Sequence, residues 1–226
     1  MEMLQEALDY LQARGLLQPI IDRAAAGKLA RDGIQTKVIK QFKRPVIIMA
    51  GSTSPATSLD LNTMNDMLQE AFSRYSGTII SGGTKAGICE LAGNLQAVHG
   101  DQLETIGYLP AELPLGTIPD ERYTFLRRTT GSIFSCLEPL QYWHDIVKNS
   151  ILPKEVKIIG IGGGRISRFE YLLGAAIGAK VGLVEGTGGC VDEILGLDLC
   201  DTVRLDHDGS LITKFIQSRT CNTPRS

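Results

Sequence analysis

Three glycine-bearing segments decide the fold of this chain: VIIMAGS at residues 46–52, TIISGGT at residues 78–84 and VKIIGIGGG at residues 156–164. Each begins as an apolar, largely β-branched run, which is typical of a strand covered on both faces. Each is followed by a stretch with helical periodicity. A glycine turn between a strand and a helix aims backbone N–H groups at one edge of a sheet. The three segments therefore predict an edge that binds anions, above all phosphate.

Strands and helices alternate outward from these turns. We expect strands at 46–51, 78–81, 104–109, 156–161, 180–185 and 202–205, and helices near 59–74, 86–98, 167–178, 190–196 and the C-terminus. This alternation predicts an α/β fold, a Rossmann-like doubly wound parallel sheet flanked by helices. Ligands then bind beyond the carboxyl ends of the strands, at the switch point, which is where the glycine turns fall.

Residues 1–42 form an N-terminal helical appendage in this interpretation, and residues 43–226 form the Rossmann-like domain. Two short helices are expected in the appendage, because apolar residues repeat with helical spacing in both. The helical pair either packs on the domain, or it makes an oligomer contact or a link to another module.

Residues 111–150 break the alternation and are interpreted as a long, irregular insertion. Pro110 precedes this stretch, Pro114, Pro119 and Pro139 interrupt it, and the arginines at 122, 127 and 128 cluster within it. Such an insertion at the ligand edge is either a lid or specificity loop, or a decorative subdomain with a solvated basic face. Phe134, Tyr142 and Trp143 are expected to form its local core.

Composition narrows the class of protein. The 226 residues carry a formal charge of −2, with 43% hydrophobic and 21% charged residues, which is typical of a globular protein and argues against a general nucleic-acid binder. Five scattered cysteines without a CxxC pair fit reduced thiols in a cytoplasmic protein. No secretory signal or apolar run of about 20 residues is visible, so we expect no membrane contact.

Resident metals and cofactors are not expected. The three histidines lie far apart in the sequence and no Cys/His spacing suits a metal ion. A P-loop and the GxGxxG dinucleotide fingerprint are also missing from the sequence.

The loop at residues 81–88 is a candidate ligand loop. Gly82 and Gly83 would let the backbone approach a phosphate or ribose, and Thr84 and Lys85 would add a hydroxyl group and a charge. Gly87 would allow close packing of the following helix. Glycines that serve backbone geometry alone are the alternative.

The loop at residues 162–170 carries the other charged groups. Arg165 and Arg168 are candidates for phosphate contact. Glu170 either binds ribose hydroxyls or acts on the glycosidic carbon, or it completes a capping box with Ser167 as the N-cap. The turn at 185–193 either lines the site through Gly188 or simply starts a helix. The residues expected to bind the ligand are Gly51, Ser52, Gly82, Gly83, Thr84, Lys85, Gly87, Gly163, Gly164, Arg165, Ser167, Arg168, Glu170 and Gly188.

These motifs, in this order, resemble the SLOG superfamily of Rossmann-like domains. The superfamily includes the LOG phosphoribohydrolases and the LSDAT sensor region of melastatin-type TRP channels. The matching stretches are 51–52, 82–87, 105–110 and 163–170, and the resemblance covers roughly residues 44–205.

Two functions follow from the resemblance. Residues 134–143 and 163–171 look like bacterial relatives of the sensor region. This implies a domain that binds a nucleotide-derived signal, ADP-ribose-like or cyclic, forms a homo-oligomer and controls an attached or partner effector. We favour this function because the enzyme motif PGGxGTxxE is matched only in part, with Ile166 at its later glycine.

The alternative is a LOG-like nucleoside 5'-monophosphate phosphoribohydrolase, which cleaves the N-glycosidic bond. The resemblance then makes Glu170 catalytic, together with an arginine from the middle of the chain. A domain with a purely structural role is the third interpretation.

Overall fold

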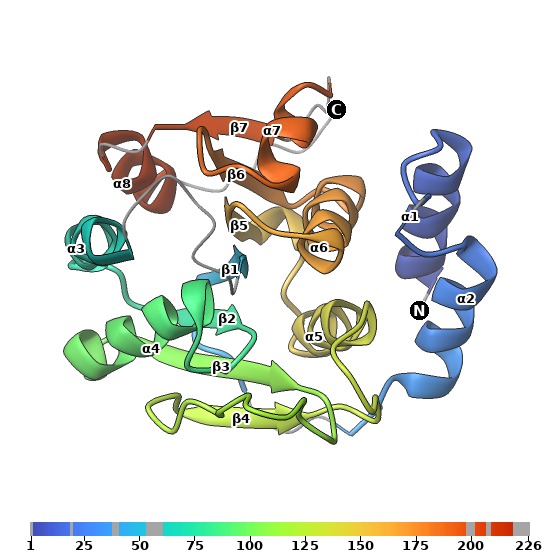
Figure 1. Cartoon of the computed structure of the whole chain (residues 1–226), viewed down its shortest axis with the longest axis horizontal. Helices are drawn as coiled ribbons and strands as arrows, with labels where there is room; N and C mark the ends of the chain where they lie inside the picture. The colour runs from blue at the N-terminus through green and yellow to red at the C-terminus, as the bar shows by residue number, and fades with distance from the viewer. Residues whose placement is uncertain are drawn as a thin grey trace.

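The computed structural model describes residues 2–18, 20–37, 41–52, 61–197, 202–206 and 209–218. Seven strands form one sheet in the order β4-β3-β2-β1-β5-β6-β7, and every neighbouring pair is parallel (Figure 1). The strands are β1 (Val46–Gly51), β2 (Thr78–Ser81), β3 (Glu104–Leu109), β4 (Phe125–Arg128), β5 (Val156–Ile161), β6 (Lys180–Val184) and β7 (Thr202–Leu205). The predicted doubly wound parallel sheet is confirmed.

The switch point lies between β1 and β5. From β1 the chain winds outward to β4 on one side, and from β5 it winds outward to β7 on the other. Ala50 pairs with Gly160 and Gly51 with Ile161, so both strands end at the same level of the sheet. The loops that follow them therefore open side by side, as a doubly wound sheet requires.

Helices cover both faces of the sheet (Figure 1). One face packs against α3 (Leu61–Phe72), α4 (Gly87–His99) and α8 (Ser210–Gln217), and the other against α5 (Leu137–Lys148), α6 (Arg165–Ala176) and α7 (Cys190–Leu195). Successive residues of β1 divide between the two cores: Ile47 and Met49 belong to one, and Ile48 and Ala50 to the other. This period of two explains why the whole strand is apolar.

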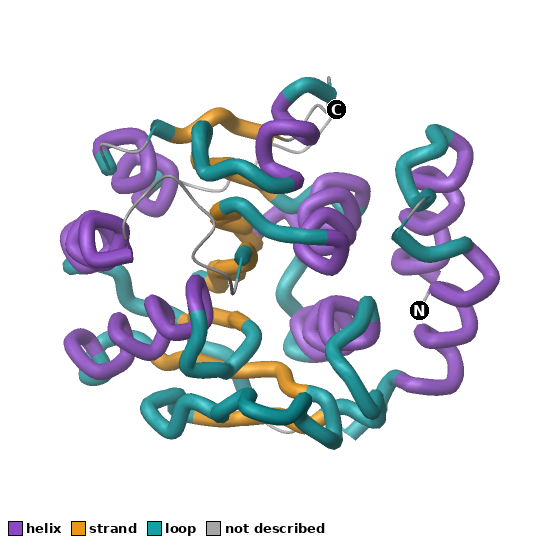
Figure 2. The backbone as a smooth tube through the Cα atoms, in the orientation of Figure 1, coloured by secondary structure: helices purple, strands orange, loops and turns teal. Residues whose placement is uncertain are grey.

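The N-terminal helices form a further layer outside α5 and α6 (Figure 2). They are α1 (Glu2–Ala13) and α2 (Arg23–Lys28), which continues into the π-helical turn η1 (Leu29–Gly33). Leu4, Leu8 and Leu11 are buried in the same core cluster as the inner face of α6. The appendage therefore packs on the domain, which was one of the two open possibilities.

The stretch from 111 to 150 is more regular than the sequence suggested. It contains β4, which forms the edge of the sheet, and α5, a helix of the inner layer. Trp143 is fully buried and Tyr142 nearly so, both in the main core cluster rather than in a local one. The expectation of an irregular insertion is wrong. The strand β4 has only four residues and was therefore missed. Pro139 does not interrupt α5, because it lies in the first turn, where proline is compatible with a helix.

Within the described ranges, none of the helices combines the length and the apolar character needed to cross a bilayer.

Candidate functional site

A cavity of about 1060 Å³ opens at the carboxyl edge of the sheet, at the switch point. The end of β1 contributes Gly51 and Ser52, and the loop after β2 contributes Gly82, Thr84 and Lys85. From the far side of the switch point come residues 164–167 and Glu170 of α6. The sheet thus brings together nine of the predicted residues from three separate segments.

The N-terminus of α6 forms one side of this cavity. Gly164 is the N-cap residue, and the backbone N–H of Arg168 donates to its carbonyl over 2.9 Å. The helix therefore begins at Arg165, two residues before the expected start. Gly164, Arg165 and Ile166 line the cavity, and backbone N–H groups of a first helical turn have no partner within the helix. This end carries the positive pole of the helix dipole.

Ser167 is not the N-cap, so the capping-box interpretation of Glu170 is wrong. The Ser167 hydroxyl instead donates to the carbonyl oxygen of Gly51 over 3.1 Å. This contact ties the first turn of α6 to the end of β1 and fixes the two sides of the switch point. Glu170 lies in the second turn of α6 and lines the cavity.

Gly163 shapes the loop without lining the cavity. Its φ of +106° disfavours any other residue, and a Cβ there would lie 2.5 Å from the Ser167 Cβ. Gly164 has open space around its Cα and an ordinary backbone conformation. The two adjacent glycines therefore have different roles: one sets the path of the backbone, and the other keeps a helix start uncovered.

The turn after β6 holds the loop after β5 in place through hydrogen bonds. Thr187 Oγ1 accepts a 2.8 Å hydrogen bond from the Gly162 N–H and donates over 2.7 Å to the Val184 carbonyl. The Cys190 N–H donates over 3.0 Å to the Gly163 carbonyl. Gly188 lies in this turn and does not line the cavity. The third glycine turn thus holds the second one in place.

The loop after β2 divides in the same way. Gly82, Thr84 and Lys85 line the cavity, whereas Gly83 and Gly87 do not. Gly83 has a φ of +72°, and a Cβ there would lie 3.0 Å from the Gly107 Cα. Gly83 therefore permits close packing of neighbouring strand ends, and Gly87 begins α4.

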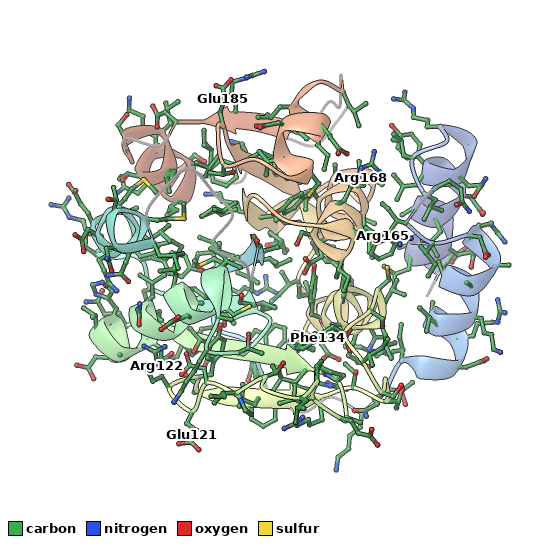
Figure 3. All side chains as sticks on the ribbon, in the orientation of Figure 1. Glu121, Arg122, Phe134, Arg165, Arg168 and Glu185 are labelled. Atoms are coloured by element: carbon green, nitrogen blue, oxygen red, sulfur yellow. The ribbon has the colours of Figure 1, made fainter. Side chains whose placement is uncertain are left out.

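The two arginines of α6 have different environments. Arg165 lines the cavity, and its Nη2 donates to the Ile20 carbonyl over 3.1 Å. Arg168 Nη1 donates to the Leu16 carbonyl over 3.1 Å, and its Nε lies 3.4 Å from Glu193 Oε2. Figure 3 shows both on the side of α6 that faces the N-terminal helices. Arg168 is thus an anchor for these helices and lies outside the cavity lining.

None of the arginines in the 111–130 region lines the cavity. Arg122 forms an ion pair with Asp120 at 2.5 Å. Arg127 is buried, 2.6 Å from the Asp145 carboxylate. Arg128 Nη1 donates to the Pro110 carbonyl over 3.0 Å.

The helix α5 and the residues before it add functional groups that sequence reasoning had not assigned. Tyr142, Glu138, Cys136 and Phe134 all line the cavity. The only signal for them in the sequence was the resemblance of residues 134–143 to a sensor region. Burial raises the pKa of Glu138, while its hydrogen bonds from Thr129 and the Ser135 N–H act in the opposite direction.

Glu170 is the most perturbed acid of the site. Burial raises its pKa to about 8, a hydrogen bond from Tyr142 lowers it, and the charge of Glu138 raises it further. The Tyr142 hydroxyl lies 3.4 Å from Glu170 Oε1. The Glu170 carboxyl group therefore keeps its proton in most molecules at neutral pH. A neutral carboxyl group can donate a hydrogen bond to a ligand.

No protein-family model and no curated protein sequence matches this chain. Solved structures match it in fold. The molybdenum cofactor carrier protein of Chlamydomonas reinhardtii is 20% identical, with a TM-score of 0.54 over 77% of this chain and 98% of that one. A second structure of the carrier protein gives 19% identity and a TM-score of 0.51, with the same coverage.

A structural-genomics target, TM1055, aligns with 74% of this chain and 95% of its own, at 20% identity and a TM-score of 0.49. The two structures of the carrier protein, with TM-scores above 0.5, share the Rossmann-like α/β fold of this chain. At these identities the likeness concerns the fold alone. It supports the fold that the sequence resemblance implied, and it does not distinguish the sensor branch from the enzyme branch.

Proposed function

We propose that this chain binds a nucleotide-derived small molecule and serves as its sensor. The observation that carries the proposal is the cavity at the switch point, where the N-terminus of α6 and the Arg165 side chain meet the ends of β1 and β2. A helix N-terminus and an arginine together favour a phosphate group. Lys85 and the Thr84 hydroxyl line the same cavity from the β2 side.

The remainder of the cavity suits the uncharged part of such a ligand. Tyr108, Phe134, Pro139, Tyr142 and Ile166 contribute aromatic and aliphatic surface. At about 1060 Å³ the cavity is slightly larger than the range of about 300–1,000 Å³ that is usual for small-molecule sites. A mononucleotide, an ADP-ribose or a cyclic dinucleotide is of suitable size.

Two observations favour binding over hydrolysis of the ligand. The arginines of the 111–130 region, from which a hydrolase would draw its partner for Glu170, have other partners and do not line the cavity. Glu170 itself is largely protonated at neutral pH, since its pKa is raised to about 8. A protonated carboxyl group stabilises a developing positive charge at the ribose poorly.

The neighbouring structure from Chlamydomonas reinhardtii is described as a carrier of the molybdenum cofactor. We therefore include it among the ligands to be tested.

The test is a thermal-shift panel with ADP-ribose, cyclic ADP-ribose, NAD, AMP, cyclic dinucleotides and the molybdenum cofactor, followed by chromatography of each sample. A ligand at about 100 times its Kd adds about 2.7 kcal/mol, which is several degrees of Tm for a chain of this size. A shift with the ligand recovered intact supports the proposal. Release of free base from AMP would identify a hydrolase instead, and no shift with any ligand would refute both functions.

A matched pair of variants locates the site. Arg165→Ala removes the guanidinium group that lines the cavity, and we expect it to weaken binding at least tenfold, about 1.4 kcal/mol. Arg128→Ala removes the same charge from the edge strand, outside the cavity, and should leave the Kd within about twofold. Equal effects of the two variants would place the ligand elsewhere. Light scattering with and without ligand measures whether occupancy changes the expected homo-oligomer.

A further inference from the structure

The cavity has a wall that the Rossmann-like domain does not supply. Ile20, Ile21 and Leu29 line it, although they belong to the N-terminal helical segment. All three are partly buried and pack against the main core cluster. The appendage therefore extends beyond the outer face of α6 and reaches the ligand edge of the sheet.

Polar side chains of the domain hold this segment by its backbone. The Ile20 carbonyl accepts from Arg165, and the Leu16 carbonyl accepts from Arg168, each over 3.1 Å. Further along, Thr130 Oγ1 donates to the Gly33 carbonyl over 2.9 Å, and Arg127 Nη2 donates to the Gln35 carbonyl over 3.1 Å. These bonds tie four backbone carbonyls of the N-terminal segment to the domain, and the one to Ile20 comes from a residue that lines the cavity.

Arg165 joins the two parts of the site. Its side chain lines the cavity beside the N-terminus of α6 and also donates to the Ile20 carbonyl. An anionic group bound at this helix end therefore lies next to the aliphatic surface of Ile20 and Ile21. Phe134 and Pro139 extend the apolar surface on the α5 side.

We propose that residues 20–29, the wall segment, determine which ligand this cavity accepts and close more tightly when the ligand binds. The ligand class is an anion attached to a flat, largely apolar heterocycle, because the anion then lies at α6 while the ring packs on Ile20 and Ile21. Since one molecule contacts both α6 and the wall segment, its binding free energy also stabilises the docking of the N-terminal helices. Ligand occupancy thus becomes a change on the outer layer of the protein. The inference rests on the proposed function, whose site it completes.

Affinity measurements on matched variants test the wall. AMP and ADP-ribose are titrated calorimetrically into the wild type, Ile20→Ser and Ile34→Ser. Ile34 is also partly buried against the core cluster but does not line the cavity. Removing aliphatic carbons from a ligand pocket costs about tenfold or more in affinity, so Ile20→Ser should raise the Kd at least tenfold and Ile34→Ser by no more than about twofold.

Hydrogen exchange tests the coupling. With ADP-ribose bound, amides of the wall segment should exchange at least several-fold more slowly than in the free protein, and amides of the distant helix α8 should be unchanged. In the ligand-free protein, Arg165→Ala should accelerate exchange in the wall segment, because it removes the bond to Ile20. This second measurement does not depend on any ligand.

The outcomes separate this inference from the proposed function. Ligand binding that is equal in the wild type and in Ile20→Ser, with unchanged exchange in the wall segment, overturns the inference and leaves the function standing. If the wild type binds no ligand of the wider panel, the proposed function fails, and the specificity wall fails with it. Unchanged exchange in Arg165→Ala overturns the anchoring of the wall segment whether or not a ligand is found.

Discussion

The perturbed acid of the site gives a prediction with a definite sign. The pKa of Glu170 rises from an ordinary 4.5 to about 8, mainly because of burial. Between these values the native state keeps a proton that the unfolded chain has already lost. The stabilisation linked to this proton is fully present below about pH 4.5 and is lost as the pH rises through about 8.

The magnitude follows from the width of this window. Each pH unit inside it lowers the free energy of unfolding by about 1.4 kcal/mol, so three units give about 4 kcal/mol as an upper bound. Glu170 is only partly buried and lines the cavity, so solvent screens its carboxyl group, and we therefore expect about half of that bound. Glu170→Gln is uncharged at every pH and its Oε1 can still accept from Tyr142, so it should abolish this part of the pH dependence.

Urea denaturation of both proteins from about pH 5 to about pH 8 measures the difference. As the pH rises across this range, the free energy of unfolding of Glu170→Gln should increase by about 2 kcal/mol relative to that of the wild type. Other titrating groups are common to both proteins and cancel in this difference. Glu70→Gln, an exposed position on α3, should run parallel to the wild type. If the free energy of unfolding of the wild type and of Glu170→Gln depends on pH in the same way, the reasoning is refuted, because Glu170 would then ionise in the native state as it does in water.

Three further predictions concern the buried ion pair and the loops. Asp145→Ala leaves the buried Arg127 guanidinium without its partner at 2.6 Å, and urea denaturation should show a loss of about 3–5 kcal/mol; a loss below about 1 kcal/mol would contradict this. Gly163→Ala places a Cβ 2.5 Å from a neighbouring side chain at a φ of +106°, so it should lower the free energy of unfolding by about 1–3 kcal/mol. Gly164→Ala meets no neighbouring atom and should keep a wild-type Tm. Equal Tm values for the two variants would count against the assigned roles. Thr187→Val removes both hydrogen bonds that support the loop after β5 and should lower stability by about 1–3 kcal/mol in thermal unfolding, with an unchanged Tm as the contrary result.

The chain's local patterns were sufficient to predict the sheet. Apolar runs rich in β-branched residues predicted six of the seven strands, and the glycine turns after three of these strands predicted the edge at which the cavity opens. Strand β4 was not predicted, because it has four residues and only one of them is buried. A short edge strand carries too few apolar positions to stand out from a loop.

Side-chain roles at the site were harder to predict. Arg165 and Arg168 are three residues apart and looked equivalent, yet only Arg165 lines the cavity, while Arg168 contacts the Leu16 carbonyl. Serine is a favoured N-cap residue, which pointed to Ser167, but the N-cap of α6 is Gly164. Which way a helical side chain points depends on the segment packed against it, and that segment lies about 150 residues away in sequence.

The sequence by itself determined the doubly wound sheet, its glycine turns and the edge where a ligand would bind. These features follow from backbone preferences and from a burial pattern with a period of two, both of which are local. The tertiary structure alone decided that the N-terminal segment forms a wall of the cavity, that α5 lines it, and that Glu170 keeps its proton near neutral pH. Each of these depends on burial by residues distant in the chain, and desolvation of a carboxyl group is set by the groups that surround it in space.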